Sequence, residues 1–238
     1  MKLKNTKFRI YFLNFILLTF IISCEKEEKQ IEPTVTFTYN GNEVTYGTIV
    51  YAGRVWMDRN LGASRIANSY NDTASFGDFF QWGREADGHQ IKTSDTISTL
   101  ALSGQQPKHD KFIITKNYYD WNSDENWTTR WLTKFGKKTY ADPCPSGWRV
   151  PTKEEWQSAI NSGQWNNYKD GFNSPLKLPA AGYRSHFGDF YYLYDFSLYW
   201  SSGHLGSSAS ILFLDDNYAN TNLTGRVNGL CIRCIMEE

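Results

Sequence analysis

The apolar segment at residues 10–22 is the feature that most constrains what the chain can fold into. It holds thirteen residues, of which two are polar, and four basic residues but no acidic one precede it. A helix of that length spans roughly 20 Å, which is shorter than the roughly 30 Å hydrocarbon core of a bilayer. A basic start followed by a short apolar run is typical of an export signal. We therefore expect residues 1–23 to be a signal peptide that takes no part in the fold.

The residues that end this segment carry a second signal. Residues 21–24 read Ile-Ile-Ser-Cys, which resembles the lipobox of bacterial lipoproteins, where an aliphatic and a small residue precede a cysteine that becomes lipidated. The resemblance implies lipid attachment at Cys24. Two or more acyl chains give a stable anchor, so we expect a lipoprotein that is held on the outer membrane by its N-terminal lipid.

Residues 24–33 predict a tether between this anchor and the folded body. Residues 25–30 read Glu-Lys-Glu-Glu-Lys-Gln, a charged run that favours a solvated segment. The lysine followed by two acids at 26–28 resembles the surface-export signal of Bacteroidetes lipoproteins. That resemblance implies exposure on the cell surface, with a periplasm-facing position as the alternative.

The charge of the remaining chain excludes one class of partner. Four of the 25 basic residues lie in the first 23 residues, so residues 24–238 carry 21 basic and 25 acidic side chains, a net of −4. No stripe of lysine and arginine runs through them. Nucleic-acid binding depends on neutralising phosphates with such side chains, and we therefore expect no nucleic-acid partner.

Residues 34–238 predict a single α+β domain, because neither a repeat nor a linker interrupts them. Apolar and polar residues alternate over 34–46 around Asn40-Gly41, which favours a hairpin with a type I′ turn. Short strands are expected at 49–51 and 54–57. Further strands, joined by long loops, are expected at 191–194, 198–200, 211–214 and 230–235.

A helix is expected to begin at Thr152. Residues 152–155 read Thr-Lys-Glu-Glu, a capping box in which the first and last side chains satisfy each other's backbone donors. Its inward stripe would be Trp156, Ala159 and Ile160, and Gly163 would end it.

A second, shorter helix is expected at residues 75–82. Three phenylalanines recur there at helical spacing, although Gly77 within the segment disfavours a helix.

The cysteines left after Cys24 predict one disulfide. Disulfides persist in exported proteins. Cys231 and Cys234 lie on one expected strand with their Cα atoms about 10 Å apart, beyond the usual reach of roughly 4.4–6.8 Å. Alternation places Cys234 on the more apolar face, which we expect to face inward. We therefore pair Cys234 with Cys144 and leave Cys231 as a spare thiol, either buried or exposed.

Six sequence blocks, in order, resemble a known family. Together they are similar to the Fibrobacter succinogenes major paralogous domain of Bacteroidetes surface lipoproteins, and the resemblance covers roughly residues 45–238. The blocks are Trp56–Ala63, Phe76–Arg84, Asp142–Thr152, Leu178–Arg184, Tyr199–Ser202 and Gly229–Ile235.

This resemblance implies a fold. Members resemble the C-type-lectin-like and formylglycine-generating-enzyme-like folds, with irregular antiparallel sheets, two short helices and long loops. The family pattern has a cysteine in a Pro-Cys-Pro block and another in the last strand, which match Cys144 and Cys234. Cys231 stands where the family commonly has a small residue, so no family role carries over to it.

The tryptophans and arginines of these blocks have structural interpretations. We expect the indoles to fill the core, since large aromatic rings bury much surface. The arginines would brace loops through ion pairs or stacking. The residues concerned are Trp56, Trp82, Trp148, Trp200, Arg59, Arg149 and Arg184.

Catalytic and metal-binding motifs are scarce. No nucleophile elbow, zinc-protease or phosphate-loop motif occurs, and the histidines are scattered, so we expect neither an enzyme nor a zinc site. Residues 120–124 begin like a calcium loop but have Glu125 where glycine is needed. Another calcium geometry there or at 215–217 stays open. By analogy with the formylglycine-generating enzymes, an oxidase would need reduced Cys231 and Cys234.

Recognition is therefore the favoured function. Residues 185–194 and 215–228 combine aromatic rings with amides and carboxylates, which suit glycans and protein ligands alike. In C-type-lectin-like proteins, ligand surfaces lie on loops before the last strand, which these segments resemble in position. The alternatives are a structural or adhesive subunit of an envelope or appendage assembly, or simple turn-forming composition. The candidate ligand-binding residues are His186, Asp189, Tyr191, Asp216, Asn217 and Tyr218.

Overall fold

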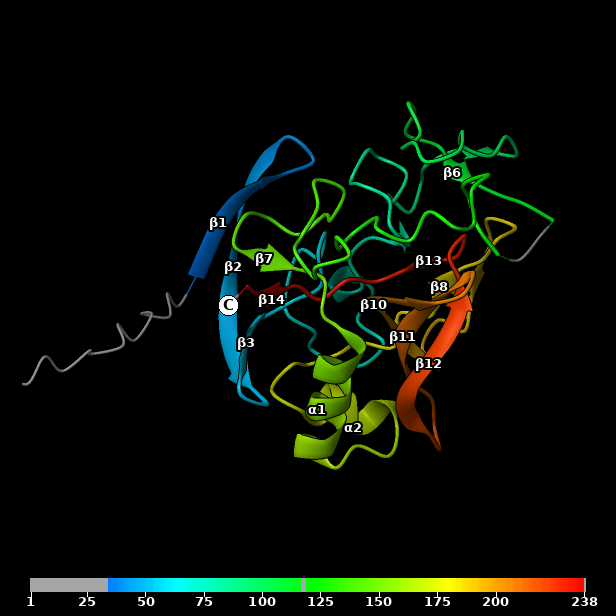
Figure 1. Ribbon diagram of the computed structural model, residues 1–238. Coiled ribbons are helices and arrows are strands. Elements are labelled where there is room, and N and C mark those ends of the chain that lie inside the picture. Colours follow the sequence, from blue (N-terminus) through cyan, green and yellow to red (C-terminus); the bar gives the residue numbers. More distant parts are fainter. Residues whose placement is uncertain (1–33, 117–118, 238) are drawn as a thin grey trace, which may run out of the picture. The chain divides into compact units, whose positions relative to one another are not determined.

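The computed structural model of the protein describes residues 34–116 and 119–237 (Figure 1). The chain divides into two compact units, Met1–Gln30 and Ile31–Glu238. The helices and strands described below belong to the second unit.

Several expectations fall outside the described residues. They are the signal peptide at 1–23, the tether at 24–33 and the lipid on Cys24. Within the part of the chain that the structure describes, no helix has the length and apolar character needed to cross a membrane.

The N-terminal hairpin opens a five-stranded antiparallel sheet. Asn40 and Gly41 both have positive φ angles, 48° and 77°, as a type I′ turn requires, so the predicted hairpin is confirmed. Residues 49–51 extend its second strand instead of forming a separate one, and Ala52 and Gly53 turn the chain into the third. The sheet order is β1 (Thr34–Tyr39), β2 (Asn42–Tyr51), β3 (Arg54–Met57), β14 (Ile235–Met236) and β7 (Trp148–Arg149).

Among the described residues, three further sheets accompany this one. A three-stranded antiparallel sheet holds β10 (Ser197–Leu205), β11 (Ser208–Leu214) and β12 (Ala219–Gly225). A four-stranded antiparallel sheet has the order β4 (Phe80–Gln81), β13 (Gly229–Leu230), β8 (Tyr183–Arg184) and β9 (Phe190–Tyr191). The short strands β5 (Thr96–Ile97) and β6 (Phe112–Ile113) pair in parallel.

The first helix, α1 (Lys153–Gly163), begins where the capping box predicts. The Thr152 hydroxyl accepts a hydrogen bond from the Glu155 N–H, and the Glu155 side chain accepts one from the Thr152 N–H. The expected stripe of Trp156, Ala159 and Ile160 is buried. Gly163 is the last helical residue, and Gln164 beyond it takes the left-handed conformation that closes the helix.

The expected helix at 75–82 is wrong. That stretch contains the end of a 3₁₀ turn (Thr73–Ser75) and then β4. Gly77 has a φ of +72°, and a Cβ there would lie 2.4 Å from the Leu61 carbonyl oxygen. The recurring phenylalanines are buried because they pack in the core, and their spacing does not reflect a helix.

The second helix is instead α2 (Tyr168–Asn173). The Asn167 side chain caps it by accepting from the N–H groups of Lys169 and Asp170. With two short helices and predominantly antiparallel sheets, the fold is α+β, as the sequence predicts.

The expected C-terminal strand at 230–235 is split into β13 and β14, which join different sheets. Alternate side chains of this segment enter two hydrophobic clusters, with Leu230, Ile232 and Cys234 in one and Cys231 and Ile235 in the other. Both faces are therefore buried, whereas the sequence favoured one inward face.

Of the cysteines that the structure describes, two form a disulfide and one is free. Cys144 and Cys234 form a disulfide with their Cα atoms 5.9 Å apart, which confirms the predicted bridge. Cys231 is a buried free thiol whose Sγ donates to the Phe76 carbonyl oxygen. Burial raises the pKa of this thiol to about 12, so it is protonated at neutral pH.

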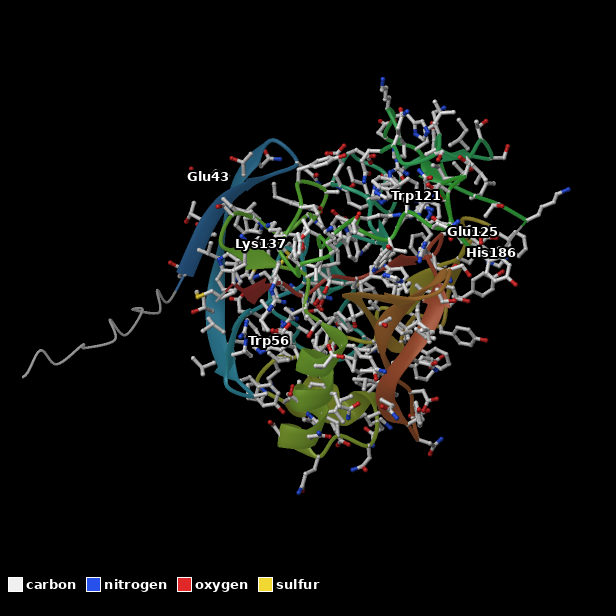
Figure 2. All side chains as sticks on the ribbon, viewed as in Figure 1. Glu43, Trp56, Trp121, Glu125, Lys137 and His186 are labelled. Atoms are coloured by element: carbon white, nitrogen blue, oxygen red, sulfur yellow. A yellow bond between two sulfur atoms is a disulfide. The ribbon has the colours of Figure 1, made fainter. Side chains whose placement is uncertain are left out.

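The predicted core tryptophans are all buried. Three of their indole N–H groups donate to backbone carbonyls: Trp56 to Tyr51, Trp82 to Ser201 and Trp200 to Phe80. Figure 2 shows Trp56 inside the fold, near β3 and α1.

The three arginines brace loops as predicted. Arg59 pairs with Asp58 at 2.7 Å and Arg149 with Glu155 at 2.7 Å. The Cζ atom of Arg184 lies 4.3 Å from the centroid of the Phe112 ring.

Candidate ligand-binding site

The segment Phe190–Tyr194 is held in a conformation that its side chains disfavour. After β9 pairs with β8, Tyr192 and Tyr194 have φ angles of 53° and 77°. Bulky residues rarely adopt positive φ, and such strain, on the order of 1–3 kcal/mol per residue, persists only where the surrounding structure enforces it. Strained residues gather at binding and active sites, so this segment is a candidate site.

Backbone contacts enforce that conformation. The Tyr194 N–H donates to the Ala180 carbonyl at 2.8 Å, and the Phe196 N–H donates to that of Tyr192 at 3.1 Å. Gly182 lies directly against the turn, because a Cβ on it would be 2.2 Å from the Tyr191 carbonyl oxygen. Only glycine allows this approach.

Six aromatic rings form a continuous chain of contacts from this segment, which we call the aromatic ladder. Neighbouring centroids lie 6.1, 6.2, 4.2, 5.3 and 5.9 Å apart, and the Tyr192 and Phe196 rings are nearly parallel at 8°. The rings of Tyr191, Tyr192 and Tyr218 are 43–50% exposed. In order, the ladder consists of Tyr191, Tyr183, Tyr192, Phe196, Phe213 and Tyr218.

A hollow of about 180 Å³ is lined in part by the four inner rings of the ladder, and we call it the ladder hollow. Residues of β8, β10, β11, β12 and β13 line it, and Figure 1 shows β8 beside the upper end of β12. Among the described residues that line it, none is charged. They are Tyr183, Tyr192, Phe196, Leu198, Ile211, Phe213, Asn222, Leu223, Thr224 and Leu230.

Polar groups on β12 face this hollow beside the rings. The Asn222 side-chain oxygen accepts from the Leu223 N–H at 2.8 Å, which fixes the amide while its NH₂ group supplies donors. The Thr224 hydroxyl accepts from the Asn228 side chain at 3.0 Å. Flat rings beside oriented amide and hydroxyl groups can stack on a sugar face and bond its hydroxyls.

The structure brings two of the predicted residues into the ladder, since Tyr191 and Tyr218 form its two ends. His186 packs against Phe187 with centroids 4.0 Å apart, and its carbonyl accepts from a loop N–H. Figure 2 shows His186 at the periphery. The Asp189 carbonyl oxygen accepts from the Ser185 N–H across the turn before β9.

The remaining predicted residues form the turn between β11 and β12. Asp216 pairs with Lys169 at 3.5 Å on the surface. The Asn217 N–H donates to the Asp215 carboxylate at 2.8 Å, which stabilises the turn. Neither side chain lines the ladder hollow.

Sequence reasoning missed Tyr183, Phe196, Phe213 and Thr224 as site residues. A signal for Phe213 exists, because residues 211–214 are apolar at every position, which requires cover on both faces of the strand. Phe213 and Ile211 share the face toward the ladder hollow, while Leu212 belongs to the core on the other face.

The residues considered for calcium have other partners. Both carboxylate oxygens of Asp120 accept from Arg130, at 2.8 and 2.5 Å, and one also accepts from Arg226 at 3.1 Å. The Asn122 oxygen accepts from two backbone N–H groups. Within residues 34–116 and 119–237, no cluster of three or more histidine, cysteine or acidic residues is arranged to hold a metal ion.

The cysteine site that an oxidase would need is not assembled. Cys234 is bonded to Cys144 and cannot supply a thiolate.

No family model, curated protein or solved structure matches the chain.

Proposed function

We propose that the protein is a non-catalytic binding module that recognises neutral glycans through the aromatic ladder and the ladder hollow. One observation carries the proposal: four contacting rings of the ladder, including the half-exposed Tyr192, line an uncharged hollow next to a strained turn. Rings present flat apolar faces to sugar C–H groups, and the amide of Asn222 can bond hydroxyls. A protein ligand is the other occupant that the sequence allows.

The uncharged lining supports a neutral ligand. An acidic saccharide would need a basic partner to compensate its desolvated charge. Among the described lining residues none supplies one. Neutral hexose polymers therefore fit the site better than uronic acids or sulfated glycans.

The anchor and the family belong to the same proposal. Cys24 would carry the lipid that holds the module on the outer membrane, facing the cell surface. The six blocks and the α+β architecture support membership of the Fibrobacter succinogenes major paralogous domain family, with a C-type-lectin-like fold. Palmitate labelling that is lost in Cys24→Ala tests the anchor, and unchanged labelling would refute it.

The alternative, a subunit of an envelope or appendage assembly, has less structural support than the glycan-binding proposal. Assembly by strand addition uses unpaired N–H groups on an edge strand. On the edge strand β12, the Thr221 and Leu223 N–H groups donate to the side chains of Asn220 and Asn222. Such local bonds oppose the addition of another strand there.

A glycan array tests the proposed function. The labelled full chain should bind neutral oligosaccharides, and Tyr192→Ala should weaken binding about tenfold, because losing a stacked ring costs on the order of 1.4 kcal/mol. Tyr192→Phe should retain most of the binding, since it keeps the ring. Tyr140, an exposed tyrosine outside the ladder at 76%, gives the matched control Tyr140→Ala, which should change nothing. Equal binding by all four proteins, or none to any glycan, would contradict the proposal.

A further inference from the structure

A second hollow, of about 170 Å³, shares a wall with the strained segment. Phe190 and Leu193 line it on that side, and the buried rings of Phe76 and Phe79 form its floor. The complete lining is Thr73, Phe76, Phe79, Lys92, Phe190 and Leu193. We call it the Lys92 pocket, and the residues that line it are distinct from those of the ladder hollow.

The size and lining of this pocket suit one apolar group of a small ligand. Four of its six lining residues are phenylalanine or leucine. A cavity of about 150 Å³ lined by such side chains can hold one benzene molecule. The pocket can therefore take a single aromatic ring or a branched aliphatic group of similar size.

Lys92 supplies the only charge among the described lining residues. Its Nζ lies 5.4 Å from the Phe76 ring centroid and 5.9 Å from that of Phe79, so the ammonium is held over the apolar floor. It donates to the Thr73 carbonyl at 3.2 Å, and an ammonium has three donors. A carboxylate entering the pocket would meet a positioned cation beside an apolar surface, where charge pairs are less screened than in bulk water.

We propose that the Lys92 pocket binds small monocarboxylic acids that carry one aromatic or branched aliphatic group. The apolar body lies on Phe76 and Phe79 and displaces the ammonium from their faces. The carboxylate accepts from Lys92 at the rim. This second site does not depend on glycan binding at the ladder.

Phenylacetate and its neutral isostere phenylacetamide test the proposal by ligand-observed NMR titration of the full chain. The acid should bind about fivefold more tightly than the amide, as expected for one partly exposed ion pair. Lys92→Met, which keeps the alkyl stem and removes the charge, should abolish this preference, and Lys92→Arg should restore it. Thermal unfolding of each variant should match the wild type, because Lys92 is exposed.

The controls separate this site from the ladder. Tyr192→Ala should leave phenylacetate binding unchanged even if it abolishes glycan binding. Loss of phenylacetate binding in Tyr192→Ala would overturn the proposal by placing the ligand in the ladder hollow. Equal affinity for acid and amide, an unchanged preference in Lys92→Met, or no binding of either compound would also overturn it.

Discussion

At the scale of single residues, the tightest constraint on the candidate site is the contact between Gly182 and the turn after β9. Gly182 has a φ of +60°, and a Cβ there would lie 2.2 Å from the Tyr191 carbonyl oxygen and 2.8 Å from the Leu193 nitrogen. Both atoms belong to backbone, which cannot rotate away as a side chain does. The positions of Tyr192 and Leu193, and so of both hollows, depend on the absence of that one carbon atom.

Gly182→Ala should therefore damage stability and binding together. We expect the free energy of unfolding to fall by about 3 kcal/mol, from the left-handed backbone and from overpacking, and glycan binding to be lost. Gly206 is the matched control, since its φ is +56° and nothing lies within 4 Å of an added Cβ. Gly206→Ala should cost only about 1 kcal/mol and should bind normally. Urea unfolding measures both losses of stability. Equal losses in Gly182→Ala and Gly206→Ala would show that the contact at Gly182 is not decisive.

His89 is a buried residue whose titration couples stability to pH in the acidic range. Its Nε2 accepts from the Gln81 N–H at 3.0 Å and its Nδ1 lies 2.7 Å from Asp87, so the buried ring is neutral. Burial, followed by the nearby Arg84 charge, lowers the pKa of His89 to about 3. The unfolded chain takes up the proton near pH 6.5, so the stability that the neutral ring contributes is lost as pH falls from about 6.5 toward 3.

His89→Gln removes this titration while its amide oxygen can still accept from Gln81. Between pH 7 and pH 4 the wild type should lose about 3 kcal/mol more stability than the variant does. Burial raises the pKa values of Asp78 and Asp142 to about 6. Their protonation therefore favours the folded state as pH falls, and it does so equally in the wild type and in His89→Gln. Urea unfolding at several pH values measures the difference, and parallel stability profiles would show that His89 does not titrate as described.

At the scale of elements, local chemistry made some parts predictable. The hairpin over residues 34–46 follows from alternation and Asn40-Gly41, and α1 follows from a capping box that closes as predicted. In each case neighbouring residues determine the conformation. Geometry excluded a bond between Cys231 and Cys234, and alternation together with the family pattern selected Cys234 as the partner of Cys144.

Other elements depend on residues distant in sequence. Residues 75–82 have helical spacing, yet Gly77 packs against the Leu61 carbonyl and turns the chain. The polar strand β12 forms because β11 offers it an edge, and its own sequence predicts a turn. Residues 230–235 read as one strand, but their two ends pair with different sheets.

The candidate site also depends on contacts between residues that are distant in sequence. The sequence pointed to Tyr191 and Tyr218 from the composition of their loops. It did not indicate that Phe196 and Phe213 connect them, because that contact joins β11 to the segment before β10. The polar residues it favoured serve turns and a surface ion pair instead.

The disulfide links the loop before β7 to the residue that precedes β14, across 90 residues. Closing a loop of that length lowers the conformational entropy of the unfolded chain, which stabilises the folded state by about 4 kcal/mol. The double variant Cys144→Ala, Cys234→Ala should lose roughly this stability in guanidinium unfolding. Cys231→Ala is the control, since it removes a buried thiol without a crosslink and should cost about 1 kcal/mol. A double variant no less stable than that control would show that the bridge contributes little.

At the scale of the whole molecule, the buried and the exposed groups support the proposed binding module in different ways. The buried charged groups serve the fold, as the pairing of Asp120 with two arginines shows. The buried thiol of Cys231 is held protonated. Four rings of the aromatic ladder, including the half-exposed Tyr192, line one uncharged hollow. The proposed lipid on Cys24 would present that surface outside the membrane.

Chemical-shift mapping tests this account most directly. A neutral oligosaccharide that the array identifies is titrated into the isotopically labelled protein, and the backbone amide signals are followed. We predict that the signals that move cluster at Tyr183, Tyr192, Asn222 and Thr224, around the ladder hollow. Shifts confined to other surfaces, such as the loops around His186 and Asn217, would contradict the assignment of the site.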